Sequence, residues 1–172
     1  MTTLSLVIRP ERPEDAPAID RLQARAFGPG RFARTAYRLR EKAAERMDLG
    51  VTASVGSFLV GSARMGPVRT GSSRFVMLGP LAVDPSFEGR GIGGTLTRAA
   101  IEAARQAGEG LVILVGDAPY YSRFGFTPVP PGRLTLPGPV DPARVLWLEL
   151  ADGFRQGISG AVEALRPEES RS

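Results

Sequence analysis

One stretch of the chain decides which fold to expect, and it reads VDPSFEGRGIGG over residues 83–94. Apolar residues typical of a strand come before it, and residues with helical spacing follow it. Its glycines let the backbone approach a ligand closely, and the first turn of a helix carries N–H groups without an intrahelical acceptor. These groups and the helix dipole favour an anion such as phosphate, and Arg90 adds a positive charge beside them.

The elements on either side of this stretch predict a β-α-β crossover. Phe75–Val83 is almost continuously apolar, which is typical of a central strand covered on both faces. Gly79-Pro80 interrupts it, and because proline donates no hydrogen bond to a ladder, we expect a bulge or a local parting from one neighbour there. Gly91–Gly108 has the apolar spacing of a helix, and Leu111–Val115 is expected to be a buried strand parallel to the first.

The same periodicity and turn signals predict the rest of the chain. N-terminal to the crossover they indicate a strand at Leu4–Ile8, a helix from Pro13 to Gly28, a second from Phe32 to Gly50, and a hairpin of Val51–Val55 with Phe58–Met65. C-terminal to it they indicate a short helix near Pro119–Phe124, a strand at Phe126–Val129, a proline-rich irregular loop up to Pro142, and a strand at Val145–Leu150. The 172 residues carry no repeat or linker, which predicts a single domain over residues 1–172 with its core at about residues 4–150 and a tail, 153–172, that frays.

Composition removes several kinds of chemistry. The chain has no cysteine and no histidine, so disulfides, thiolate nucleophiles, cysteine metal sites and a Ser–His–Asp triad are excluded, and we expect no metal site. Carboxylates, tyrosines, one lysine, the terminal amine and water remain for proton transfer. The sequence shows neither a secretory signal nor about 20 consecutive apolar residues, which predicts a cytoplasmic protein with no membrane partner.

The glycine-rich stretch also matches other phosphate-binding patterns in part. Gly89, Gly91 and Gly94 satisfy the dinucleotide-binding fingerprint, but two predicted helices and four predicted strands precede them. The acidic residue expected about twenty positions later is also missing. No Gly-Lys-Ser/Thr follows, which excludes a nucleoside-triphosphate loop. A turn without any ligand is the remaining alternative.

Two motifs at this separation resemble the GNAT superfamily of acetyl-CoA-dependent N-acetyltransferases, from the first strand to about Leu150. The family signature, Gln/Arg-x-x-Gly-x-Gly/Ala, is matched by EGRGIG at residues 88–93, with Glu88 in place of the usual Gln or Arg. A later family pattern, a tyrosine shortly before Gly-Phe, appears as YSRFGF at residues 121–126. The resemblance implies a mixed α/β fold: a central, mostly antiparallel sheet with a splayed pair of parallel strands, flanked by helices.

The resemblance also implies a cofactor site for acetyl-CoA. The pyrophosphate is expected on the backbone amides of the glycine loop, and the pantetheine arm is expected to pair with the splayed central strand. The cofactor-binding residues implied in this way are Leu81, Ala82, Val83, Glu88, Gly89, Arg90, Gly91, Ile92, Gly93 and Gly94. Tyr121 occupies the family's general-acid position, where a phenol with an ordinary pKa of about 10 is protonated at neutral pH, and Tyr120 is the neighbouring alternative.

The implied reaction is direct transfer of acetyl to a primary amine of a small-molecule or peptide acceptor by a monomer or homodimer. Asp84, Glu88, Asp117 or a water chain are candidates for the base, and the acceptor is expected near the loop Phe27–Phe32 and the proline-rich segment after Val129. A non-catalytic coenzyme A-binding sensor or interaction module is the main alternative. A nucleic-acid binder using the basic face from Arg31 to Arg46 is a second, but a solvated helix face is favoured and no nucleic-acid partner is expected.

Overall fold

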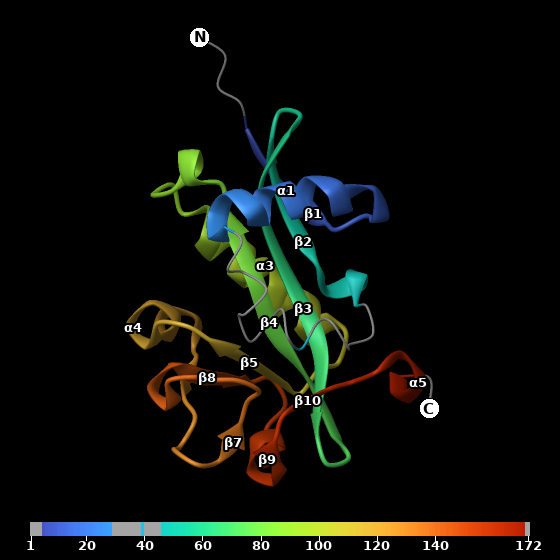
Figure 1. Cartoon of the computed structure of the whole chain (residues 1–172), viewed down its shortest axis with the longest axis vertical. Coiled ribbons are helices and arrows are strands. Elements are labelled where there is room, and N and C mark those ends of the chain that lie inside the picture. Colours follow the sequence, from blue (N-terminus) through green and yellow to red (C-terminus); the bar gives the residue numbers. More distant parts are fainter. Residues whose placement is uncertain (1–4, 29–38, 40–45, 171–172) are drawn as a thin grey trace.

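The computed structural model describes residues 5–28, 39 and 46–170. Its centre is a sheet in the order β1-β2-β3-β4-β5-β8-β6, with β10 attached to β3 (Figure 1). The strands are β1 (Leu6–Pro10), β2 (Val51–Val55), β3 (Phe58–Thr70), β4 (Ser73–Val83), β5 (Leu111–Val115), β6 (Thr127–Pro128), β8 (Val145–Glu149) and β10 (Glu163–Ala164). β7 (Leu134–Thr135) and β9 (Gly160–Ala161) form a separate parallel pair.

The sheet has the mixed character that the resemblance implies. Within the described residues β4 and β5 run parallel, and the other neighbours in the large sheet are antiparallel. The helices are α1 (Ala16–Phe27), α3 (Ile92–Gln106), α4 (Ala118–Tyr121) and α5 (Pro167–Ser170). α1 lies in front of the sheet and α3 behind it in Figure 1, so the predicted fold class is confirmed. Among the described helices, none has both the length and the apolar character needed to cross a bilayer.

Alternation along β4 builds two cores. Val76 and Leu78 point to the α3 side, where they pack with Leu96 and Ala100. Side chains at the intervening positions, such as Phe75 and Met77, join a second cluster with Trp147, Ile158 and Val162. A strand buried on both faces has the near-continuous apolar run that predicted its central position.

The expected interruption at Gly79-Pro80 is confirmed as a bulge. Ala63 of β3 pairs with Leu81 and Met65 pairs with Leu78, so β4 uses one residue more than β3 between the two pairs. The Gly79-Pro80 peptide is cis. Because of the extra residue, Leu78 and Leu81 both face α3 although they are three positions apart, a spacing that puts residues of a regular strand on opposite faces.

Several boundaries differ from the prediction. The first strand begins at Leu6, and β3 continues to Thr70 because it pairs with β4 over that whole length. The predicted second helix, Phe32 to Gly50, lies largely outside the described residues; Leu39 is helical and buried, and Met47–Leu49 is a single 3-10 turn.

The C-terminal segment was expected to fray, and in the structure residues 158–165 instead pack onto the body. Ile158, Val162 and Leu165 are buried, and Glu163 of β10 pairs with Arg69 of β3. The Arg69 guanidinium contacts the carboxylates of Glu163 and Glu169, each at 2.7 Å. The polar residues of the tail therefore face solvent or ion-pair partners, while its apolar residues complete the second core.

Candidate functional site

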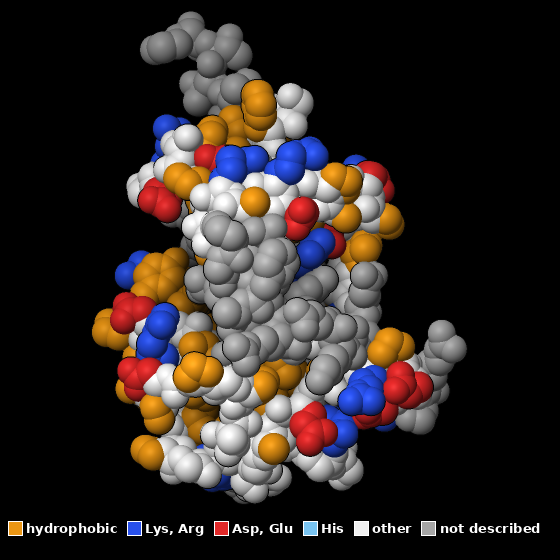
Figure 2. Space-filling view, viewed as in Figure 1, with side chains coloured by type: hydrophobic (Ala, Val, Ile, Leu, Met, Phe, Trp, Pro, Cys, Tyr) orange, Lys and Arg blue, Asp and Glu red, His pale blue; other side chains and the backbone are white. Residues whose placement is uncertain are grey.

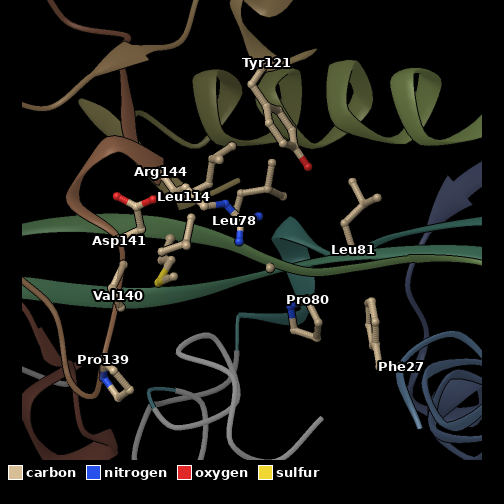
Figure 3. Close-up of a pocket in the computed structure, with 13 residues that line it drawn as sticks. Phe27, Leu78, Pro80, Leu81, Leu114, Tyr121, Pro139, Val140, Asp141 and Arg144 are labelled. Carbon is tan, nitrogen blue, oxygen red and sulfur yellow. The ribbon is translucent and has the colours of Figure 1, made fainter. Parts of the chain in front are cut away.

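The parallel strands β4 and β5 separate at the bulge. Their pairing consists of Val76 with Val112 and Met77 with Ile113, after which β5 stays paired with β8 up to Val115. A pocket of about 340 Å³ occupies the space where they diverge (Figure 3). The described residues that line it are Phe27, Met77, Leu78, Gly79, Pro80, Leu81, Leu114, Val115, Tyr121, Pro139, Val140, Asp141 and Arg144.

Tyr121 points its hydroxyl into this gap. It reaches from α4 on one side of β4, while Pro80 and Phe27 lie on the other side (Figure 3). The ring contacts Phe126 edge-on, with centroids 6.0 Å apart, and it leaves no room for a side chain at Gly116, where a Cβ would come within 2.5 Å of the ring. The Tyr121 ring is thus held by packing, and its hydroxyl lies at the point where the strands part.

Tyr120 points elsewhere. Its hydroxyl lies 3.5 Å from where a Cβ on Gly93 would be and 3.8 Å from the same point on Gly94, so it lies over the first turn of α3. The Arg123 guanidinium stacks on the Tyr120 ring at 4.6 Å. The two adjacent tyrosines therefore point to different regions: Tyr121 points into the gap, and Tyr120 points to the start of α3.

The glycine loop has the backbone conformation that the sequence requires. Gly89 and Gly91 have φ of +78° and +77°, a region that disfavours residues with a Cβ, and a Cβ at either position would meet open space. Gly91 is the N-cap of α3, and Ile92 is buried in the core, which leaves the backbone of that turn, not the Ile92 side chain, for a ligand.

Three guanidinium groups lie close to this loop and the start of α3. Arg90 stacks on Phe87 at 5.0 Å and Arg98 on Phe124 at 4.9 Å, and Arg123 is the third. Glu88 is exposed. This end of α3 therefore combines the positive helix dipole with three exposed cations and one exposed carboxylate.

Among the described residues, Asp84 makes contacts that hold the local backbone in place. Its carboxylate accepts hydrogen bonds from the Ser86 backbone N–H at 2.9 Å and from Nε of Arg25 at 3.1 Å. The Ser86 bond and then Arg25 lower the pKa of this carboxyl group below its ordinary value. A carboxylate stabilised in this way is a weak base, and its position fixes the turn Pro85–Phe87 that leads into the glycine loop.

The other predicted residues are only partly brought together. Leu81 lines the pocket, Val83 lies beside Gly93, and Ala82 is buried on the opposite face, paired with Ser62. Asp117 is exposed at the N-cap of α4 and, like Glu88, is not among the described residues of the pocket wall. Of the suggested acceptor loops, Phe27 and the segment Pro139–Asp141 line the pocket, whereas residues 29–32 lie outside the described ones.

Sequence reasoning placed the proline-rich segment near the acceptor but did not single out the two charged residues of the pocket, Asp141 and Arg144. Arg144 lies in the turn Pro142–Arg144, which precedes β8, and Asp141 is the N-cap of that turn. The Asp-Pro pair at residues 141–142 signals a turn, but not where that turn lies relative to the gap. The nucleic-acid alternative rests mostly on residues outside the described ones; Arg46, which is described, is paired with Asp48 at 3.0 Å and Glu109 at 2.9 Å.

A model of the acetyltransferase (GNAT) family matches residues 16–126, which include the glycine loop, both parallel strands and Tyr121. The chain belongs to the GNAT acetyltransferase family. This GNAT protein is similar to the N-acetyltransferase YhbS of Escherichia coli K12, with 31% identity over 160 residues that cover 92% of this chain and 95% of YhbS.

Two solved structures of GNAT proteins are similar over most of the chain. The Escherichia coli YhbS structure in complex with CoA has a TM-score of 0.80 and 29% identity, covering 100% of this chain and 95% of that one. A GNAT acetyltransferase from Brucella melitensis in complex with acetyl-CoA has a TM-score of 0.65 and 28% identity, covering 86% and 89%. These matches confirm the expected superfamily, and membership of it supports an acyltransferase.

Proposed function

We propose that this GNAT protein transfers an acetyl group from acetyl-CoA directly to a primary amine. The observation that carries the proposal is the position of the Tyr121 hydroxyl, which points into the gap between β4 and β5. Related GNAT structures hold CoA or acetyl-CoA, which supports the same cosubstrate here. An acid at this point is suited to protonate a departing thiolate.

The start of α3 is proposed to hold the pyrophosphate. Backbone N–H groups of the loop from Gly89 to Gly94 would donate to it, and the open space around Gly89 and Gly91 leaves room for its oxygens. Arg90, Arg98 and the Tyr120 hydroxyl lie close enough to this turn to add charge and a further donor. These contacts would compensate for the exposed Glu88 carboxylate.

The pantetheine arm is proposed to run from this loop along β4 into the gap. Leu81 and Val83 face the α3 side of that strand, where the arm would pass, and Ala82 contributes backbone. Backbone N–H groups near the bulge would donate to the thioester carbonyl oxygen, which gains negative charge as the amine attacks. A preorganised donor of this kind typically lowers a barrier by roughly 3 kcal/mol.

The reaction itself would need little covalent help from the chain. The amine nitrogen forms a bond to the carbonyl carbon, the carbon–sulfur bond breaks, and the sulfur takes a proton from Tyr121. The amine loses a proton to water, and Tyr121 regains one from solvent. Because the chain has no cysteine and no histidine to activate a serine, direct transfer is favoured over an acyl-enzyme.

A non-catalytic coenzyme A-binding sensor remains the competing function, and Glu88 in the family signature is the observation that favours it. Release of free thiol from acetyl-CoA in the presence of a panel of amines, corrected for hydrolysis, distinguishes the two. We expect acceptor-dependent release, with Tyr121→Phe lowering kcat by on the order of 100-fold, since general acids contribute about 10²–10⁴.

Tyr120→Phe is the matched control, because it removes a hydroxyl from the adjacent residue that points at α3 instead of the gap. It should leave kcat near the wild-type value and change the affinity for acetyl-CoA. Acetyl-CoA binding without acceptor-dependent release from any amine would favour the sensor, and equal losses of kcat in both variants would remove the role given to Tyr121.

A further inference from the structure

The pocket wall carries a pair of opposite charges that the proposed reaction does not use. Asp141 and Arg144 are the charged side chains among the described residues that line it; the rest are apolar side chains, a glycine and Tyr121. Both lie away from the glycine loop, at the end of the proline-rich segment and in the turn that precedes β8. Charged side chains placed in this way among apolar neighbours are the groups that select and orient a polar ligand.

The backbone holds these two charges in a fixed relation to each other. The Asp141 carboxylate accepts a hydrogen bond from the Ala143 N–H at 2.9 Å, and the Arg144 N–H donates to the Asp141 carbonyl at 2.9 Å. The Arg144 carbonyl in turn accepts from the Gly116 N–H at 2.9 Å, at the end of β5. The turn is thus tied to the strand that forms one wall of the gap.

Arg144 is directed toward the reaction centre. In Figure 3 its guanidinium reaches toward Leu78 and Leu114, and Nε is 3.4 Å from the Gly116 carbonyl oxygen. In the described part of the chain no carboxylate forms an ion pair with it, and the pair Asp141–Arg144 is not itself bridged. A guanidinium placed so has its forked donors available for a bidentate anion.

We infer that the acceptor is a small zwitterion of amino-acid type, whose carboxylate binds Arg144 and whose amino group lies on the Asp141 side until it enters the gap. This inference rests on the proposed acetyl transfer and specifies its substrate class. The Asp141 carboxylate attracts the ammonium form and repels a second acidic group. Phe27, Pro139 and Val140 provide an apolar wall for the acceptor side chain.

The size of the pocket agrees with a small acceptor. A pocket of about 340 Å³ can hold the reacting end of the thioester together with an acceptor of amino-acid size. The amino terminus of a peptide is the principal competing acceptor. At the position where a free amino acid has its carboxylate, a peptide has an amide, which cannot form the ion pair with Arg144. A comparison of acceptors with and without the free carboxylate therefore distinguishes the two substrate classes.

Matched acceptors test the inference. A panel of free amino acids is compared with their carboxamides and with the corresponding amines that lack the carboxyl group, by thiol release at saturating acetyl-CoA. We expect kcat/KM to be on the order of 10- to 100-fold higher for the free acids, the range expected for a charge-assisted hydrogen-bonded pair. Arg144→Gln should remove this preference by raising KM for the acids and leaving the carboxamides unchanged, and Arg144→Lys should restore part of it.

Titration calorimetry with acetyl-CoA keeps the two hypotheses apart, since Arg144 lies outside the loop proposed for the pyrophosphate. Unchanged affinity in Arg144→Gln shows that the fold and the cofactor site are intact. Equal activity with acids and carboxamides, activity with amines or peptides but not with acids, or equal loss on all acceptors in Arg144→Gln would each overturn the inference while leaving acetyl transfer in place. Acetyl-CoA binding with no transfer to any member of the panel would overturn both.

Discussion

Alanine at Gly91 separates the two contributions that this residue makes, one to backbone conformation and one to the proposed phosphate site. Its φ is +77°, and an alanine in this left-handed region costs about 1–2 kcal/mol. For a chain of this length, that cost lowers Tm by roughly 2–8 °C. The new methyl group enters open space at the N-cap of α3, where the pyrophosphate is proposed to lie, and we expect the Kd for acetyl-CoA to rise on the order of 10- to 100-fold.

The same helix provides the control. Gly108, just beyond the C-terminal end of α3, has φ of +82° and also faces open space. Gly108→Ala therefore carries the same conformational cost without approaching the loop. Thermal unfolding and titration calorimetry should show similar losses of Tm in the two variants and a loss of affinity in Gly91→Ala alone. Wild-type affinity in folded Gly91→Ala, or equal weakening in both variants, would refute the placement of the phosphate.

Three further predictions concern stability. Hydrogen bonds from Arg9 at 2.7 Å are the main cause of the lowered pKa of Asp15. Asp15→Asn should therefore lower the free energy of unfolding by about 2 kcal/mol at pH 7. A carboxyl group whose pKa is lowered by folding stabilises the fold at pH values above its unfolded pKa of about 3.9. The difference in unfolding free energy between wild type and Asp15→Asn, measured in urea, should therefore shrink as the pH falls below about 4. A pH-independent difference would contradict the ion pair. Gly61→Val should destabilise by about 1–3 kcal/mol in the same assay, because even a Cβ there would lie 2.7 Å from Cδ1 of Leu96 and 3.3 Å from the Cβ of Ala53. Phe58→Ser is the control, because Phe58 lies on the same strand and is 73% exposed; equal effects of the two substitutions would contradict the packing at Gly61. Ile158→Ala should cost about 2–5 kcal/mol and leave the Kd for acetyl-CoA unchanged, whereas an effect below 0.5 kcal/mol would show that the C-terminal segment does not complete the core.

The sequence predicts the centre of the fold well because its signals there are local. Glycines at positions 89 and 91 need a left-handed backbone whatever surrounds them, and Gly79-Pro80 disrupts a strand ladder in any sheet. The hydrophobic run of β4 likewise reports burial on both faces without reference to its partners.

Long-range pairing explains what the sequence could not predict. β10 is a two-residue strand that forms only by pairing with β3, about ninety residues earlier. The glycines and polar residues of the C-terminal segment around it are typical of a disordered tail. Asp141 and Arg144 reach the gap only because their turn is bonded to Gly116. Adjacent positions on a helix point about 100° apart, which predicts different directions for Tyr120 and Tyr121. Which of the two faces the gap follows from how α4 packs, and spacing alone leaves that open.

The surface in Figure 2 shows charges of both signs dispersed over the described part of the visible face, with no large area of one sign. That the net charge of +4 does not mark a nucleic-acid interface stays a prediction. Binding that is steeply salt-dependent would indicate such an interface.

The proposed acetyl-CoA site, at the glycine loop and the gap between β4 and β5, can be tested by residue-resolved amide NMR during titration with acetyl-CoA. The spectra report which N–H groups contact the cosubstrate. We expect saturable shifts concentrated at Gly89, Gly91 and Gly93 and along β4 from the bulge to Val83, with Gly108 unaffected. Saturable binding whose shifts avoid the start of α3 and the gap between β4 and β5, or no binding at millimolar acetyl-CoA, would contradict the proposed site.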